Sequence, residues 1–284
     1  MRIGVDSYSY HRLLGEVRPG EVPARGHLPD GGLAVIAEAR RLELDGVSLE
    51  TCFLGAPDPA MGRVLADAAG PLELVFAWGA PNGLAFGASS TALSDLLAWL
   101  EVAAAAETRT LRIVVAGPAL RGREHVELQI ERTCAPLRVA ARRAAALGIG
   151  LAIENHADLT ARQLGNLIER ANDDAIGVCF DTANAQRVGD DVPAALRLLA
   201  PHVLMVHLKD VEPTAEDPIA GPRSVAYGTG AIPLVPLLDL LSQRGFAGLL
   251  CVEIGQLAPG ADERVLVSDS VDWLRARGYA ERGS

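Results

Sequence analysis

The feature of this sequence that most constrains its fold is a regular alternation of short apolar runs with longer helix-like segments. Eight runs have the character of β-strands, and several are unbroken stretches of Val, Ile and Leu, as is typical of parallel strands covered on both faces. The predicted strands are Arg2–Asp6, Gly46–Glu50, Leu72–Trp78, Leu111–Ala116, Ile149–Glu154, Ile176–Asp181, Val203–His207 and Leu249–Glu253. This alternation indicates either a closed parallel barrel or a doubly wound sheet.

The segments between these strands are rich in Ala, Leu, Arg and Glu, which favour helices. Gly148 and Gly245 stand directly after two of them, where a glycine commonly ends a helix, and Thr160 can cap the start of another. The predicted helices include Leu33–Glu43, Thr91–Glu107, Glu124–Leu147, Ala161–Ala171, Val192–Leu199, Pro233–Arg244 and Glu263–Arg277.

The length of 284 residues matches one (β/α)₈ barrel and is too short for two large domains. Charged residues at the ends of the later strands favour the barrel over the doubly wound sheet, because barrel enzymes build their sites there. We therefore predict an α/β fold in which residues 1–284 form a single (β/α)₈ TIM barrel.

Composition and charge narrow the range of partners. The chain is 49% hydrophobic and carries a net charge of −10, which argues against nucleic acid and against anionic membrane surfaces. It has no apolar run of about 18 residues, and its start lacks the apolar core of a signal peptide. Its four cysteines have no paired spacing, as expected of reduced packing residues. We expect a cytoplasmic protein without nucleic-acid or membrane partners.

Three carboxylates and one imidazole lie at the ends of four successive strands, and they suit one divalent cation. Alternate residues of a strand share a face, so all four can point inward. The predicted ligands are Glu154, Asp181, His207 and Glu253, which share faces with Ala152, Cys179, Met205 and Cys251 respectively. The alternative is a metal-free network of these carboxylates with Arg or Lys, but the nearby inward faces supply few cations, of which Lys209 is the clearest candidate. The donor set accepts Mg²⁺, Mn²⁺, Co²⁺ or Zn²⁺.

These residues lie in segments that resemble the xylose isomerase-like TIM barrels, known as the sugar phosphate isomerase/epimerase family within the AP endonuclease 2-like superfamily. The likeness is carried by the second half of the chain. The matching segments are Ala-Ile-Glu154-Asn155-His156, Phe-Asp181-Thr182-Ala183-Asn184, Val-His207-Leu-Lys209-Asp210, Tyr227-Gly228-Thr-Gly230 and Val-Glu253-Ile.

The resemblance implies a metal-dependent enzyme of carbohydrate metabolism. In epimerases of the family, the residues matching Glu154 and Glu253 bind the metal and exchange protons on opposite faces of the substrate. This chain would then use manganese or magnesium, with cobalt or zinc as alternatives, to stabilise an enediolate while a carboxylate removes the neighbouring proton.

The chain departs from the ketose 3-epimerases of the family at two positions. Those enzymes have a substrate-contacting His where this chain has Asn184 and an Arg where it has Pro213. His156 can supply the missing imidazole as a catalytic group, or it can be a loop histidine bonded to the backbone. The endonuclease-like members are disfavoured, because they bind three zinc ions through many histidines and this acidic chain has six.

Further candidates for substrate binding surround the predicted site. Asn184 replaces a substrate-contacting residue of the family, and the other candidates lie at strand ends or in the two long loops, His11–Asp30 and Asp210–Ile232. Each has a structural alternative: pairing with an Arg, packing in a loop, plugging the barrel mouth, or exposure to solvent. These candidates are Tyr8, His11, Glu50, Trp78, Lys209 and Arg223.

The leading functional prediction is an isomerase or epimerase acting on a keto-sugar, a polyol ketone or a related sugar acid. A lyase, either a dehydratase or a decarboxylase, would use the same site and differ in product mass. A third alternative is a non-catalytic sugar-binding or partner subunit. The expected partner is a small-molecule carbohydrate, and assembly into a homo-oligomer is left open.

Overall fold

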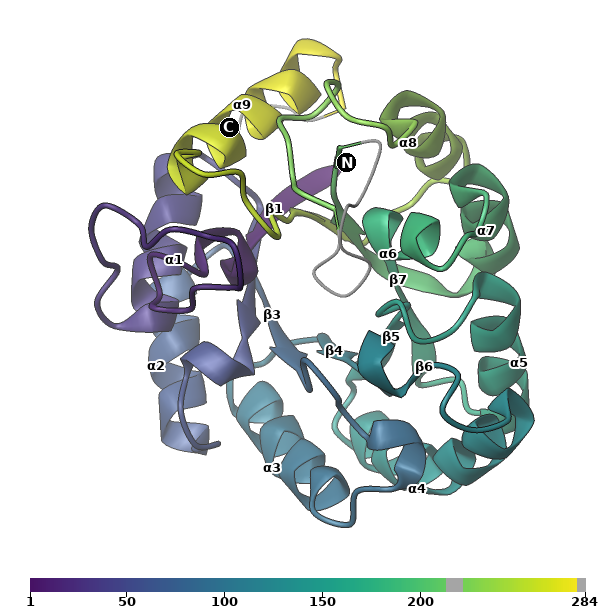
Figure 1. Cartoon of the computed structure of the whole chain (residues 1–284). Coiled ribbons are helices and arrows are strands. Elements are labelled where there is room, and N and C mark those ends of the chain that lie inside the picture. Colours follow the sequence, from purple (N-terminus) through teal and green to yellow (C-terminus); the bar gives the residue numbers. More distant parts are fainter. Residues whose placement is uncertain (213–221, 280–284) are drawn as a thin grey trace.

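The computed structural model describes residues 1–212 and 222–279, and within them the chain forms a closed barrel of eight parallel strands (Figure 1). Each strand pairs with the one before it, and the last pairs with the first, as a closed barrel requires. The strands are β1 (Arg2–Asp6), β2 (Gly46–Glu50), β3 (Glu73–Trp78), β4 (Thr110–Ile113), β5 (Gly150–Glu154), β6 (Ile176–Asp181), β7 (Val203–Leu208) and β8 (Leu249–Val252). The fold is thus the predicted (β/α)₈ TIM barrel.

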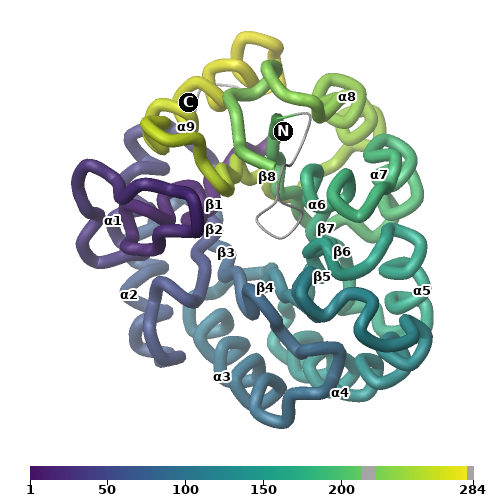
Figure 2. The backbone as a smooth tube through the Cα atoms, viewed as in Figure 1, coloured from purple at the N-terminus to yellow at the C-terminus, as the bar shows by residue number. Residues whose placement is uncertain are grey.

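Helices surround the strands, and the tube drawing shows the ring that they form (Figure 2). Thr160 caps its helix as predicted: its hydroxyl accepts from the Gln163 amide, and the Gln163 side chain accepts from the Thr160 amide. The helices are α1 (Gly31–Arg41), α2 (Pro59–Ala69), α3 (Ala92–Ala105), α4 (Val126–Ala146), α5 (Ala161–Ala171), α6 (Thr182–Arg187), α7 (Val192–Leu199), α8 (Leu234–Gln243) and α9 (Glu263–Ala276).

Two of these helices lie outside the helix ranges that the sequence analysis names, and local chemistry explains both. Helix α2 begins at Pro59, which fits the first helical position, after Asp58 has capped the Ala60 amide at 2.8 Å. Helix α6 begins directly after Asp181, whose carboxylate accepts from the Asn184 amide at 2.7 Å. The second cap places the start of a helix on a candidate metal ligand.

The barrel encloses a small inner core beneath the ends of the later strands. Leu249, the first residue of β8, fills the end of this core nearest the starts of the strands. Gly46 packs against it without a side chain, because a Cβ there would lie 2.8 Å from both the Glu73 carbonyl and the Leu249 side chain. The inner cluster consists of Val75, Ala152, Cys179, Met205, Leu249 and Cys251. It includes the four residues expected to share a face with the candidate ligands, so those strands point the ligands inward. A much larger apolar core lies between strands and helices.

The loop after β7 is anchored by one carboxylate. Asp210 accepts backbone N–H bonds of 2.9–3.1 Å from four residues: Val211, Gly228, Gly230 and Ile232. A Cβ on Gly230 would lie only 2.2 Å from Asp210 Oδ1, so glycine is needed for this approach. Residues 213–221 of the loop, including Pro213, lie outside the described residues.

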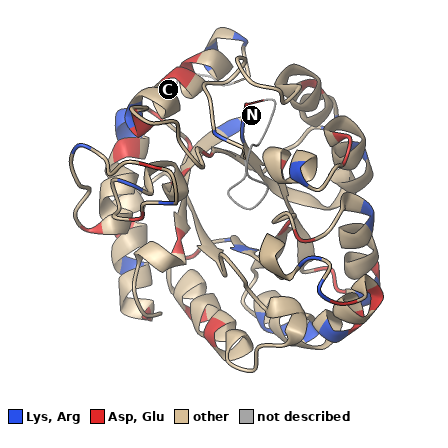
Figure 3. Cartoon of the chain, viewed as in Figure 1, with Lys and Arg blue, Asp and Glu red and all other residues tan. Residues whose placement is uncertain are grey.

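Acidic and basic residues are interspersed along the outer helices (Figure 3). Across residues 1–212 and 222–279, no helix combines the length and the apolar character needed to cross a membrane.

Candidate metal centre

The candidate metal centre lies at the C-terminal ends of the last strands. Asp181 ends β6, His207 lies in β7 and Glu253 follows β8, and one ligand atom from each lies within 4.8 Å of the others. The sheet register pairs Asp181 directly with His207. All three side chains are buried, so the barrel holds them together away from bulk water.

Glu154, at the end of β5, joins this group through His207. Its Oε2 lies 3.8 Å from His207 Nδ1, while Glu253 Oε2 lies 2.6 Å from the same nitrogen. The structure therefore brings the four predicted ligands together around one imidazole. Cys179 also lies within 4.8 Å of Glu154 and His207, but burial raises the pKa of its thiol to about 11, which keeps it protonated at neutral pH.

A buried arginine that the sequence analysis missed compensates part of this charge. Arg112 Nε lies 2.9 Å from Glu154 Oε2, and its guanidinium also pairs with Glu50. A further bond of 3.3 Å runs to the carbonyl oxygen of Trp78. Burial alone would raise the pKa of Glu154, but Arg112 lowers it below its usual value. Glu50 thus takes the alternative that the sequence left open, pairing with an arginine.

Lys209 provides the second cation. Its Nζ lies 2.8 Å from Asp181 Oδ2 and 2.7 Å from Glu253 Oε1. Burial disfavours a charged lysine, but these two carboxylates outweigh it and raise the Lys209 pKa. Lys209 in turn holds the pKa of Glu253 low, with His207 contributing, although burial acts in the opposite direction. Lys209 is therefore a permanent positive charge at the mouth of the barrel.

Two asparagines hold candidate ligands in place, one through the backbone of Asp181 and the other through the carboxylate of Glu154. The Asn155 side chain accepts from the Asp181 amide at 2.7 Å and donates to the Asp181 carbonyl at 2.8 Å, which ties β5 to β6. Asn184, in α6, donates to Glu154 Oε1 at 3.1 Å. Because Arg112 lies against the other oxygen, both carboxylate oxygens of Glu154 have a partner.

His156 lies just beyond the end of β5, two residues after Glu154. Its Nδ1 is buried and neither accepts nor donates a hydrogen bond within the described part of the chain. Burial lowers the His156 pKa to about 4, so the imidazole is neutral at pH 7. A neutral ring with an unused nitrogen is suited to proton transfer.

Tyr8 and His11 lie in the loop after β1, where the structure gives them contacts within the protein. Tyr8 donates to Glu16 at 2.9 Å, and its ring stacks on His11 with centroids 4.9 Å apart. His11 is fully buried, with Nε2 3.0 Å from Glu21 and Nδ1 2.9 Å from the Tyr8 carbonyl. Both ring nitrogens are engaged. Glu21 also accepts from the Leu257 amide at 2.8 Å, so this network joins the loops after β1 and β8.

Trp78 and Arg223 are not brought to the cluster. The Trp78 side chain belongs to the core outside the barrel, where its indole donates to Asp95 of α3 at 2.7 Å. Arg223 is half-buried, and its carbonyl oxygen accepts from the Glu212 amide at 2.9 Å beside the bridge between Val211 and Ser224.

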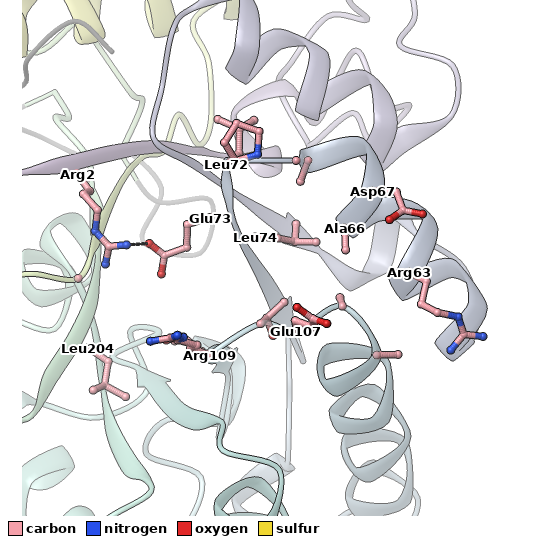
Figure 4. A pocket seen from close by; sticks show the side chains of 18 residues that line it. Arg2, Arg63, Ala66, Asp67, Leu72, Glu73, Leu74, Glu107, Arg109 and Leu204 are labelled. Atoms are coloured by element: carbon pink, nitrogen blue, oxygen red, sulfur yellow. Dashed lines mark ion pairs between the residues drawn. The ribbon is translucent and has the colours of Figure 1, made fainter. Parts of the chain in front are cut away.

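The largest cavity described lies at the opposite end of the barrel (Figure 4). It measures about 1090 Å³ and is lined by strand beginnings and the ends of α2 and α3. Arg2 pairs with Glu73 in it, and Arg63, Asp67 and Arg109 also line it. Volume alone would therefore point away from the metal centre, whereas barrel enzymes carry their chemistry at the C-terminal end.

The fold and this cluster define a class: a (β/α)₈ barrel with carboxylates and an imidazole gathered at the C-terminal ends of its strands. The chain belongs to the xylose isomerase-like TIM barrel family, whose sequence pattern matches residues 37–277. This confirms the resemblance drawn from the sequence.

Curated relatives match parts of the chain. The uncharacterized protein YihM of Escherichia coli is 31% identical over 94 residues, which cover 33% of this chain and 29% of that protein. The putative L-ribulose-5-phosphate 3-epimerase SgbU of E. coli is 30% identical over 98 residues, 34% of each chain. An inosose isomerase of Halalkalibacterium halodurans is 24% identical over 155 residues, 52% of this chain and 55% of that protein. The chain thus matches between about a third and about half of these relatives.

Solved structures of two sugar epimerases and a dehydratase share the fold across 97–100% of this chain. An L-ribulose 3-epimerase superposes with a TM-score of 0.72 at 19% identity, covering 100% of this chain and 99% of that one. The D-psicose 3-epimerase of Clostridium cellulolyticum gives 0.73 at 17% identity, covering 98% and 99%. A probable 3-DHS dehydratase of Bacillus anthracis gives 0.68 at 13% identity, covering 97% and 99%.

Proposed function

We propose that this protein is a divalent-metal-dependent isomerase or epimerase of a keto-sugar, a polyol ketone or a related sugar acid. The observation that carries the proposal is the buried cluster of Asp181, His207 and Glu253, with Glu154 against the same imidazole. The sugar epimerases among its relatives and structural neighbours support the substrate class. The expected partner is a small carbohydrate.

The donor set and the charges fit a divalent cation. Four carboxylates meet two basic side chains, an excess of two negative charges. A fifth carboxylate, that of Asp6, lies 3.7 Å from Nε2 of His207 and is counted with that imidazole as a separate pair. Buried charge of this kind requires compensation. The carboxylates are Glu50, Glu154, Asp181 and Glu253, and the bases are Arg112 and Lys209. Oxygen and imidazole donors suit Mn²⁺ or Mg²⁺, with Co²⁺ or Zn²⁺ as alternatives.

Glu154, Asp181, His207 and Glu253 would hold the cation, which would polarise a substrate carbonyl and stabilise developing negative charge. Two carboxylates lie against His207 and can act on the neighbouring C–H bond. Glu154, kept ionised by Arg112 and oriented by Asn184, is placed to remove or return the proton on one side. Glu253 has the same role on the other side. Their burial keeps bulk water away from the negative charge that develops in the reaction.

His156 favours a lyase as the second candidate. Its neutral ring and unused Nδ1 could take a proton from carbon or deliver one to a departing hydroxyl. The carbonyl chemistry would be the same, but the substrate would lose water or CO₂, so the product would be lighter than the substrate.

The deciding experiment is NMR in D₂O with the Mg²⁺-loaded and Mn²⁺-loaded protein, a panel of keto-sugars, inososes and oxo-sugar acids, and product mass. Deuterium beside the carbonyl with an unchanged formula supports the isomerase or epimerase. Loss of water or CO₂ supports the lyase. Absence of any exchange or turnover across the panel, with metal bound, would favour a non-catalytic role.

A further inference from the structure

Two triads of possible metal ligands share the imidazole of His207. The upper triad consists of Asp181, His207 and Glu253, and the thiol triad consists of Glu154, Cys179 and His207. In each triad, one ligand atom from every residue lies within 4.8 Å of the others. Hard cations such as Mg²⁺ and Mn²⁺ select oxygen ligands, whereas a thiol in the set selects softer cations. His207 therefore stands between two groups of donors that suit different metals.

The two triads lie at different depths in the barrel. The sheet register pairs Glu154 of β5 with Cys179 of β6, and it pairs Asp181 of β6 with His207 of β7. Cys179 precedes Asp181 by two residues on the same face of β6, so it lies about 6–7 Å closer to the start of that strand. Its side chain belongs to the inner core cluster. A cation held by the thiol triad would thus lie deeper than a cation held by the upper triad.

The residues that the triads share have lone pairs to spare. His207 Nε2 forms no hydrogen bond within the described part of the chain. Asp6 Oδ2 lies 3.7 Å from it, beyond hydrogen-bond distance, and is likewise without a hydrogen bond there, although both side chains are 0% exposed. Glu154 pairs with Arg112 and accepts from Asn184, which leaves about two of its roughly four lone-pair sites free. Buried polar atoms without partners are costly, so these atoms point to a ligand that supplies positive charge.

Zinc has the coordination chemistry that the thiol triad offers. It binds thiolate, imidazole and carboxylate together, at about 2.3 Å from sulfur and about 2.0 Å from nitrogen or oxygen. Its ligand atoms are then about 3.5 Å apart, so three atoms within 4.8 Å of one another need only small movements to bind it. Binding breaks the S–H bond of Cys179: the sulfur keeps the electron pair and donates it to the cation, and the proton leaves to water.

We propose that Glu154, Cys179 and His207 form a second cation position, selective for Zn²⁺ and other thiophilic divalent ions. This thiol position overlaps the candidate metal centre, because Glu154 and His207 serve both, so a cation in one position excludes a cation from the other. Zn²⁺ would therefore displace Mg²⁺ or Mn²⁺ and withdraw Glu154 from proton transfer. The thiol position itself stands on the geometry of the three side chains, whereas inhibition by zinc rests on the proposed function.

Cobalt spectroscopy tests the thiol position without turnover. Co²⁺ substitutes for Zn²⁺, and a cobalt–thiolate bond gives a charge-transfer band in the near ultraviolet that oxygen and imidazole ligands do not give. The reduced, full-length wild type should show this band on addition of Co²⁺. Cys179→Ser should lose it, and its Kd for Zn²⁺ should rise by at least about 10- to 100-fold, since even changes behind the ligands cost that much. Calorimetry measures the Kd.

Two matched cysteine variants and one measurement on the wild type control this test. Cys134→Ser changes a buried cysteine of α4, and Cys251→Ser changes the other thiol of the inner core cluster. Both variants should keep the band and the Kd for Zn²⁺. Cadmium NMR of the wild type detects a sulfur ligand without any substitution, so the test does not depend on the folding of a variant.

Deuterium exchange with Mn²⁺ separates this inference from the proposed function. A cobalt complex without the charge-transfer band, or a band that Cys179→Ser retains, overturns the thiol position whatever the enzyme turns over. Exchange that persists in saturating Zn²⁺, with the band present, overturns the overlap of the two positions. A band that Cys179→Ser loses, with no exchange on any member of the substrate panel, retains the thiol position and overturns the isomerase proposal.

Discussion

Arg112 Nε lies 2.9 Å from Glu154 Oε2, and each of these side chains is only 2% exposed. The guanidinium, supplied by β4, therefore neutralises a carboxylate supplied by β5 inside the barrel. The same arginine pairs with Glu50 of β2, so the site depends on strands that contribute no metal ligand.

Replacing this arginine should destabilise the protein. Arg112→Met leaves Glu50 and Glu154 buried without their cation, which should lower the free energy of unfolding by about 3–5 kcal/mol. Adding Glu50→Gln should recover part of the loss, because one unpaired charge disappears. Urea unfolding measures both. The control is Arg143→Met, which breaks the exposed pair with Glu101 and should cost less than about 1 kcal/mol.

A bound cation should stabilise the folded chain. Mn²⁺ or Mg²⁺ at about 100 times its Kd should add about 2.7 kcal/mol, and EDTA should remove this gain together with activity. Asp181→Asn should abolish the metal-dependent rise in Tm, whereas Asp191→Asn, at the cap of α7, should preserve it. A metal-independent Tm in the wild type would contradict the assigned centre.

Glu154 and Glu253 should each be required for proton transfer. Glu154→Gln and Glu253→Gln keep the side-chain shape but remove the base, so kcat should fall by about 10²- to 10⁴-fold. Isotope exchange in D₂O measures the loss, with Glu131→Gln at an exposed position of α4 as the control. Undiminished exchange in Glu154→Gln, with metal still bound, would rule out Glu154 as a base.

The anchor of the β7 loop should not tolerate a methyl group. Gly230→Ala places a Cβ against Asp210 Oδ1 and displaces an acceptor of four backbone bonds, so stability should fall by about 1–3 kcal/mol for each donor left unpaired. Gly165→Ala, within α5 and with space for a methyl, should instead stabilise by up to about 1 kcal/mol. Thermal unfolding distinguishes the two signs.

Asp158 should make stability fall as pH rises from about 4 to about 7. Burial raises its pKa from 3.8 to about 7, so over this range the folded chain holds a proton that the unfolded chain has lost. A pKa that is higher by one in the folded chain than in the unfolded chain corresponds to roughly 1.4 kcal/mol. The Asp158→Asn side chain does not titrate. The free energy of unfolding of wild type relative to this variant should therefore decline across the range and level off above it. A difference that does not change with pH in urea titrations would contradict the assignment.

The sequence predicted the barrel well because apolar runs and strand ends are local signals. It placed Glu154, Asp181, His207 and Glu253 correctly at one end, since parallel strands share a direction and alternate residues share a face. It missed α2, which opens with a proline in a segment of mixed character.

The electrostatics of the site could not be derived in the same way. Arg112 stands between Leu111 and Ile113 in a buried strand, an anomaly that could have drawn attention, but its partners lie on β2 and β5. Such pairs depend on register and on space inside the barrel, which Ala77 and Ala152 leave beside Arg112. His11, expected at a substrate wall, is instead bonded to Glu21 of its own loop, a contact that depends on how the loop folds back on itself.

The pairing of β8 with β1 sets the order in which the centre can form during synthesis. Glu253 follows the final strand, so a nascent chain that has emerged only as far as β7 has Glu154, Asp181 and His207 but lacks the group that bridges His207 and Lys209. The last ligand reaches its neighbours when the barrel closes. The complete set of proposed ligands therefore exists only in the closed barrel, and a chain that lacks β8 would keep at most three of the four.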